Sequence, residues 1–83
     1  MMERKLIYMP LLNEGTYVIR PVVALNIGNN TYKIIGTEQG FKPEDLDEEW
    51  LFSIGSYVTC RMELNTNDMI LVADSEVIFS SLH

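Results

Sequence analysis

Residues that carry chemistry are scarce in this sequence. Of its 83 residues, one is a cysteine, Cys60, and one is a histidine, His83, which stands last. A catalytic nucleophile needs a base held beside it, and a terminal side chain is usually mobile. A structural zinc site needs about four ligands, and a single cysteine cannot form a disulfide within the chain. The sequence therefore predicts no enzyme, no cofactor and no metal site, and it predicts that Cys60 is a small buried apolar residue.

Basic residues and long apolar runs are also few. Six lysines and arginines oppose twelve acids, which gives a net charge of −6, and only Arg4 and Lys5 are adjacent. Such a surface repels phosphate backbones, so binding of duplex DNA is disfavoured. The longest apolar run, residues 22–25, is far shorter than the roughly 20 residues of a membrane span. The first residues lack the apolar stretch of a secretory signal, so we expect a cytoplasmic protein with no membrane partner.

What the sequence does contain is period-two alternation interrupted by turn residues. Strands are predicted at residues 4–9, 16–27, 31–35, 57–64 and 69–73, with a last short strand at 77–79. Residues 28–30 and 65–68 are predicted tight turns, and at most one short helical turn is expected near 43–49. The length indicates a single compact β domain over residues 1–83. Because small sheets avoid open edges by curling, we expect an all-β fold of five or six strands in an Src-homology-3-like barrel, with an oligonucleotide-binding-fold barrel as the alternative.

Apolar residues occupy both faces of the predicted strand at 16–27. Its odd positions are expected to form the buried face, namely Tyr17, Ile19, Val23, Leu25 and Ile27. Its even positions Val18, Val22 and Ala24 are apolar too, and a strand of this kind is covered on both sides or lies at a subunit contact. A homodimer through the second face is therefore predicted, unless a bend at Pro21 lets one chain bury both faces. In the strand at 57–64, the face expected to be buried consists of Val58, Cys60, Met62 and Leu64.

An acidic stretch followed by aromatic residues is the candidate binding surface. Five acids lie within residues 44–49, and the proposed surface consists of Glu44, Asp45, Asp47, Glu48, Glu49, Trp50 and Phe52. Its negative field favours a basic protein partner, and an aromatic ring can hold a cation on its face. Calcium loops also alternate acids, but Trp50 stands where such a loop needs glycine and Ser56 where it needs its last glutamate. The alternative is that Trp50 and Phe52 belong to the core, since aromatic residues dominate small cores.

Two resemblances bear on the fold. The spacing Phe52-x-x-Gly55-x-x-Val58 resembles the diverging turn of Src-homology-3 domains, in which an acidic loop beside aromatic residues binds proline-rich basic peptides. Met-Ile-Leu at 69–71 stands where those domains carry paired tryptophans. The motifs Pro-Leu-Leu-Asn-Glu-Gly at 10–15, Arg-Pro-Val at 20–22, Tyr-Lys-Ile at 32–34 and Glu-Glu-Trp-x-Phe at 48–52 are similar to those of a group of small bacterial proteins without an established activity. That resemblance implies a bacterial source and a standalone domain, and it assigns no residue a role.

Three functions remain open at this point. A non-enzymatic protein-interaction module is the leading interpretation, and a self-associating structural protein is the second. The third is a single-strand nucleic-acid binder that uses barrel aromatics, against which the net charge of −6 argues.

Overall fold

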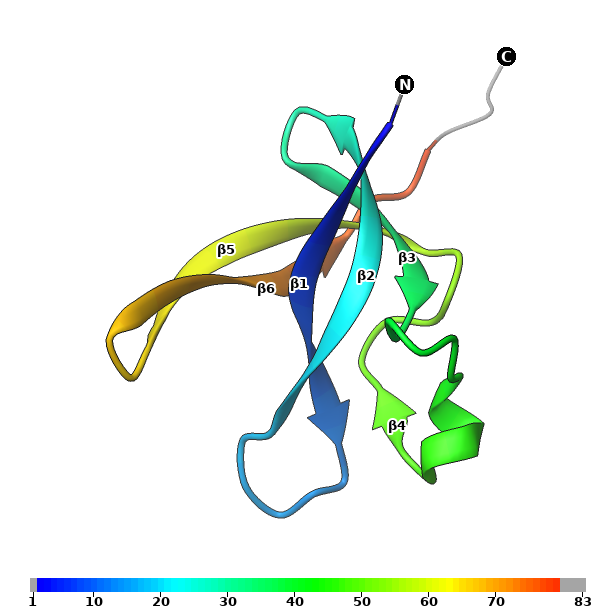
Figure 1. Ribbon diagram of the computed structural model, residues 1–83, viewed down its shortest axis with the longest axis vertical. Coiled ribbons are helices and arrows are strands. Elements are labelled where there is room, and N and C mark those ends of the chain that lie inside the picture. Colours follow the sequence, from blue (N-terminus) through cyan, green and yellow to red (C-terminus); the bar gives the residue numbers. More distant parts are fainter. Residues whose placement is uncertain (1, 80–83) are drawn as a thin grey trace.

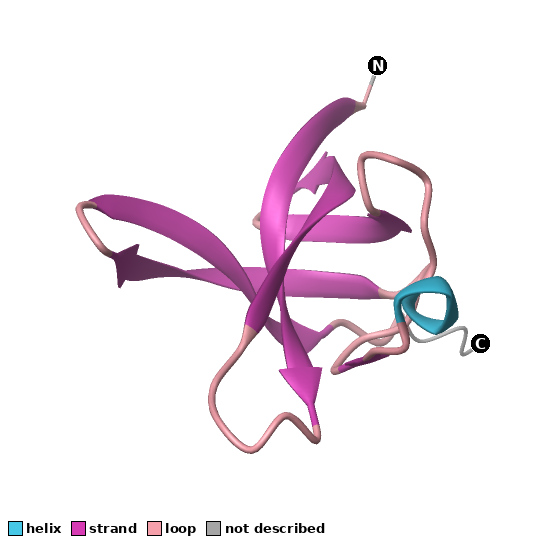
Figure 2. Ribbon diagram, turned by 60° about the horizontal axis from the view of Figure 1, so that its bottom comes forward, coloured by secondary structure: helices cyan, strands magenta, loops and turns pink. Residues whose placement is uncertain are grey.

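The computed structural model describes residues 2–79, which form an all-β fold (Figure 1). One 3-10 turn, η1, spans Pro43–Leu46 and lies beside the short strand β4 (Figure 2). The strands are β1 Glu3–Leu12, β2 Ile19–Gly28, β3 Thr31–Gly36, β4 Glu49–Trp50, β5 Tyr57–Asn65 and β6 Asp68–Glu76. The predicted all-β class and the single short helical turn near 43–49 are therefore confirmed.

The strands close into a ring. β1 pairs with β2, β2 with β3, β3 with β5 and β5 with β6, all antiparallel. β6 returns to β1 through a single parallel pair, Tyr8 and Val72. The two-residue strand β4 pairs with Leu11 and Leu12 at the end of β1. The β5–β6 hairpin crosses the β1–β2 hairpin steeply, and its outer half extends beyond the ring (Figure 1).

Local turn chemistry explains how the first strands connect. Asn29 and Asn30 both have positive φ, 53° and 55°, which is the geometry of the tight hairpin turn whose twist matches that of its strands. Asparagine tolerates this conformation better than most residues do. The predicted turn at 28–30 is thus confirmed, and it brings β3 back along β2.

The core fills the inside of the ring. Every strand contributes to it, and β1 does so with alternate residues, as the period of a strand requires. The cluster consists of Ile7, Met9, Val22, Ala24, Tyr32, Ile34, Trp50, Phe52, Val58, Cys60 and Ala73. Cys60 is therefore buried as predicted.

The prediction of the buried face of β2 is wrong. Val22 and Ala24 are fully buried, whereas Tyr17 is exposed and lies in the loop before β2. Val23, on the opposite face, is also buried. Apolar alternation alone cannot tell which of two apolar faces turns inward, because the register with neighbouring strands decides it. Since one chain covers Val22 and Ala24 itself, the reason for a homodimer through them is removed.

Two further predictions about strands are corrected. Met62 and Leu64 were expected in the core, but both are more than half exposed, because β5 continues past the ring that would cover them. Residues 77–79 were expected to form a strand, but β6 ends at Glu76. A single backbone hydrogen bond, from the Val77 N–H to the Tyr57 carbonyl at 2.7 Å, continues past that end.

Candidate functional site

The acidic stretch is held against the β1–β2 hairpin. The Glu48 carboxylate accepts hydrogen bonds from the Arg20 Nε–H at 3.0 and 3.1 Å and from the Trp50 indole N–H at 3.1 Å. It also forms an ion pair with the Arg20 guanidinium, and its side chain is only 9% exposed. The hydrogen bonds from Arg20 lower the pKa of Glu48, although burial alone would raise it. Glu48 thus joins β2 to β4 and is unavailable to a partner.

Two other acids of the candidate surface have local partners. The Asp45 carboxylate accepts a hydrogen bond from the Lys42 backbone N–H at 2.9 Å, across the start of η1. The Glu49 carboxylate accepts one from the Asn13 side-chain amide. The remaining two, Glu44 and Asp47, are exposed. Most of the negative charge predicted from the sequence therefore fixes the position of η1 and β4.

The aromatic residues of the candidate surface belong to the core. Trp50 is 7% exposed and Phe52 9%. The pairing of Trp50 with Leu11 on β1 turns the indole inward, and the Phe52 N–H lies 3.4 Å from the Met9 sulfur. The prediction that these two rings form part of a binding surface is corrected, and with it the argument for a cation held on a ring face.

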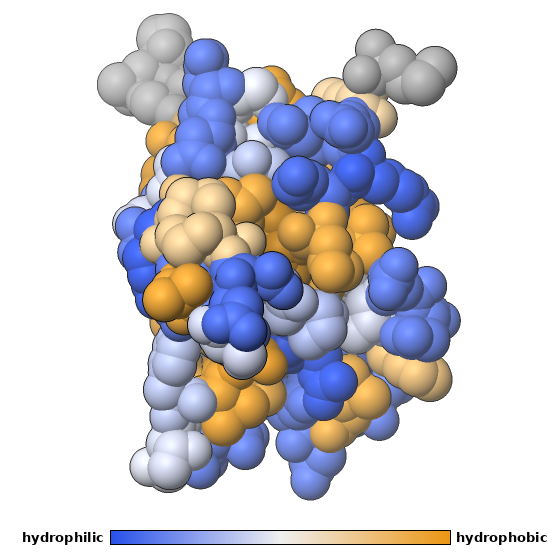
Figure 3. Space-filling view, turned by 60° about the vertical axis from the view of Figure 1, so that its left-hand side comes forward, coloured by the Kyte–Doolittle hydropathy of each residue, from blue (hydrophilic) through white to orange (hydrophobic). Residues whose placement is uncertain are grey.

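Uncovered apolar surface lies instead on the β5–β6 hairpin. Met62, Leu64 and Met69 are each more than half exposed. Met62 lies opposite Leu71, and Leu64 lies opposite Met69, so the four side chains share one face. The next pair on the same face, toward the ring, is Cys60 opposite Ala73, and both residues belong to the core. A single apolar face thus begins in the core and continues into solvent, and apolar side chains spread across this side of the molecule (Figure 3).

A groove of about 360 Å³ separates this face from β1, and we call it the β1–β6 groove. β1 and β6 meet only at Tyr8 and Val72, so the groove is the wedge that opens as the two strands diverge toward their first residues. The side chains that line it are apolar except for one lysine amine and one tyrosine hydroxyl. The lining residues are Lys5, Leu6, Tyr8, Met62, Met69, Ile70 and Leu71. Sequence reasoning missed it because Met62 was expected in the core and Met69 was expected only to begin the strand at 69–73.

The opposite face of the hairpin is covered by a polar network. The Tyr17 hydroxyl donates to the Glu63 carboxylate at 2.9 Å. Arg61 donates to the Tyr17 hydroxyl, to Glu63 and to Asp74 at 3.2, 2.9 and 3.1 Å. Burial and the hydrogen bond to Glu63 raise the pKa of Tyr17. The loop before β2 therefore supports one face of the hairpin and leaves the apolar face bare.

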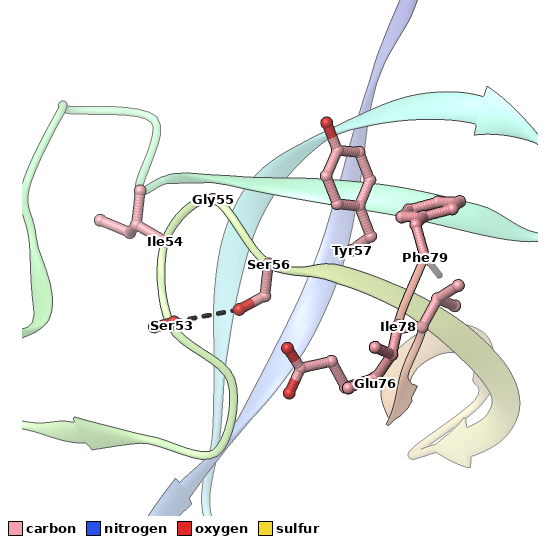
Figure 4. Close-up of a pocket in the computed structure, with 9 residues that line it drawn as sticks. Ser53, Ile54, Gly55, Ser56, Tyr57, Glu76, Ile78 and Phe79 are labelled. Atoms are coloured by element: carbon pink, nitrogen blue, oxygen red, sulfur yellow. Dashed lines mark hydrogen bonds between the residues drawn. The ribbon is translucent and has the colours of Figure 1, made fainter. Parts of the chain in front are cut away.

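A second hollow, of about 480 Å³, lies between the turn at 53–56 and residues 76–79 (Figure 4). The Ser53 and Ser56 hydroxyls share a hydrogen bond at 3.0 Å across the turn. The Tyr57 and Phe79 rings meet edge to face, with centroids 5.0 Å apart. Ile78 and Phe79 are nevertheless 80% and 60% exposed, so this end of the described chain presents apolar side chains to solvent.

Cys60 has the environment of a core residue. Burial raises the pKa of its thiol to about 11, so it stays protonated near neutral pH, where only a thiolate would act as a nucleophile or metal ligand. Within residues 2–79, no group of three or more histidine, cysteine or carboxylate side chains is placed to hold a metal ion. No helix in the described part of the chain is long and apolar enough to cross a membrane.

A comparison of the chain with models of protein families, with curated proteins and with solved structures finds no match. The two resemblances noted in the sequence therefore stay predictions, and the geometry of the surface is the basis for inferring a function.

Proposed function

We propose that this chain is a non-enzymatic protein-interaction module, built as an Src-homology-3-like barrel, whose binding surface is the β1–β6 groove. The observation that carries the proposal is the apolar face of the β5–β6 hairpin, which leaves the core and lines the groove without being covered. Soluble proteins that act alone rarely expose contiguous apolar patches, and such patches commonly mark interaction sites.

The backbone at the groove supports the same function. β6 is paired with β5 on one side, but within the described residues its other side meets β1 only at Val72. The stretch from Met69 to Leu71 therefore has a free edge beside an apolar wall. An extended segment of a partner can add to such an edge through main-chain hydrogen bonds, while its side chains enter the groove.

The side chains of the groove suit this role as well. Met62 and Met69 stand on opposite strands of the hairpin, and both line the groove. Methionine has three rotatable bonds and a polarizable sulfur, so it adapts to differently shaped apolar partners. The acidic stretch is a weaker candidate for the binding surface, because the Glu48 carboxylate already forms an ion pair with Arg20 and accepts a hydrogen bond from Trp50.

Selection from a displayed library of random peptides tests the proposal. We expect the selected peptides to contain alternating apolar residues and to bind the chain about tenfold or more weakly when Met69→Glu places a charge in the groove. The control is Leu51→Glu, which changes an exposed leucine beside β4, at the other end of β1. Melting temperatures of both variants check that they are folded. Failure to select any peptide, or peptides that bind the Met69→Glu variant as tightly as the parent, would overturn the proposal.

A further inference from the structure

We infer that the β1–β6 groove receives residues 76–79 of a second copy of the chain. The inference rests on the proposed function of the groove and names its partner. It depends on three features of the described residues. Residues 77–79 are apolar and belong to no strand, the charges beside the groove and beside this segment are opposite, and the segment is too far from the groove of its own chain to reach it.

The segment that follows β6 has the character of a ligand for strand addition. Ile78 and Phe79 are 80% and 60% exposed, and residues 77–79 belong to no strand. The Val77 N–H to Tyr57 carbonyl bond and the edge contact between Phe79 and Tyr57 hold it in its own chain. These contacts leave most of the surface of Ile78 and Phe79 in water, and burial of that surface in an apolar groove is favourable.

Charges at the groove and on the segment are complementary. Lys5 lines the groove, and Arg4 lies with it in an adjoining hollow that Glu38 also lines. Neither base forms an ion pair with any other residue between positions 2 and 79. Glu76, directly before the apolar segment, is exposed and likewise has no ion pair in that range. On a molecule of net charge −6, the one pair of adjacent bases thus stands beside the groove.

One chain cannot place its own segment in its own groove. The segment is held at Tyr57, and β5 runs five residues further before it reaches Met62 in the groove, a distance of roughly 17 Å along the strand. Three extended residues span at most about 10 Å. The segment of a second copy can reach the groove, because it is not tied to the same chain. Two copies related by a two-fold axis can each place their segment in the groove of the other, and the result is a closed dimer.

Light scattering of the full chain tests the inference. We expect a mass that rises with concentration toward twice the 9.5 kDa of one chain. Met69→Glu in the groove and Ile78→Glu in the segment should each weaken the dimer about tenfold or more, whereas Leu51→Glu should leave it unchanged. A monomer at every concentration, or a dimer that Ile78→Glu leaves intact, would overturn the inference.

Charge reversal supplies a sharper test. Lys5→Glu and Glu76→Lys should each weaken the dimer roughly fivefold, because each places like charges together. The chain that carries both changes should recover most of the parent's affinity, since the two charges again attract. If the effects of the two reversals simply add, Lys5 and Glu76 do not meet, and the inferred placement is wrong.

A synthetic peptide of residues 74–79, Asp-Ser-Glu-Val-Ile-Phe, separates this inference from the proposed function. It should bind the Ile78→Glu variant, whose groove is intact, and fail to bind the Met69→Glu variant. If library peptides bind the groove while this peptide does not, the groove is a binding site for another partner and the inference fails alone. If neither binds, the proposed function fails with it.

Discussion

Trp50 connects the acidic stretch to the core. Its ring is buried in the main cluster, and its N–H donates to Glu48, which in turn pairs with Arg20 on β2. We expect Trp50→Ala to lower the free energy of unfolding by about 3–5 kcal/mol, the usual cost of removing a large buried aromatic side chain. Denaturant titration measures it. The matched control is the exposed neighbour in Leu51→Ala, for which a loss within about 1 kcal/mol is expected. If Trp50→Ala leaves the free energy of unfolding unchanged, the indole is a surface group and not part of the core.

Glu48 should make stability depend on pH. The hydrogen bonds from Arg20 hold its pKa in the folded protein below the ordinary value of 4.5, so folding favours the ionised form. Its contribution is then fully present above about pH 4.5 and is lost as the pH falls through the lowered pKa. The free energy of unfolding should therefore decline over this window in the parent, and less steeply in the Glu48→Gln variant. Glu44→Gln, which changes an exposed acid, should keep the parent's slope; equal slopes in all three proteins would contradict the assignment.

Among the elements, the outer half of the β5–β6 hairpin has the least support. Beyond Arg61 and Val72, where β6 still pairs with β1, it is a two-stranded ribbon with one apolar face that is largely bare. Such a ribbon is marginally stable without a third strand or a covering partner. In the Ile78→Glu variant, which we expect to be monomeric, backbone amides from Met62 to Ile70 should exchange with solvent faster than those at the inner end of the hairpin. Hydrogen exchange followed by NMR measures this. Uniformly slow exchange along both strands would show that the ribbon needs no partner.

The strand β2 shows why the sequence pattern could not predict which face of a strand is buried. Both of its faces are apolar, and the ring buries Val22 and Ala24 on one side while Val23 is covered on the other. A register shift in the β2–β3 pairing falls between Val23 and Ala24, and such irregularities bend a strand and increase its twist. A bend at Pro21 was predicted as the alternative to a dimer. The register shift lies two to three residues after Pro21.

For the whole molecule, net charge predicts behaviour toward nucleic acid. With −6 overall, and with Arg4 and Lys5 as its only adjacent bases, the chain cannot neutralise the several phosphates that duplex binding requires. We expect no shift of duplex DNA in a gel titration at about 150 mM salt. Binding at micromolar concentrations of the chain under these conditions would contradict the prediction.

Features set by neighbouring residues were determined by the sequence alone. Alternation in residues 57–64 predicted a strand, and the asparagines at 29 and 30 predicted a tight turn, because both signals depend on the conformation of a few consecutive residues. The proline at 43 and the acids at 44 and 45 predicted a single helical turn for the same reason. The all-β class follows from these local preferences.

Only the tertiary structure decided which apolar residues are core and which are surface. Trp50 is buried because β4 pairs with the end of β1, and Met62 is exposed because β5 continues past the ring. Both outcomes depend on pairing between segments that are distant in the sequence, and a change of one residue in register moves every side chain of a strand to the other face. The acidic residues were visible in the sequence, but their partners Arg20 and Asn13 were not, since ring closure brings those groups together. The proposed binding surface is therefore the β1–β6 groove and not the acidic stretch.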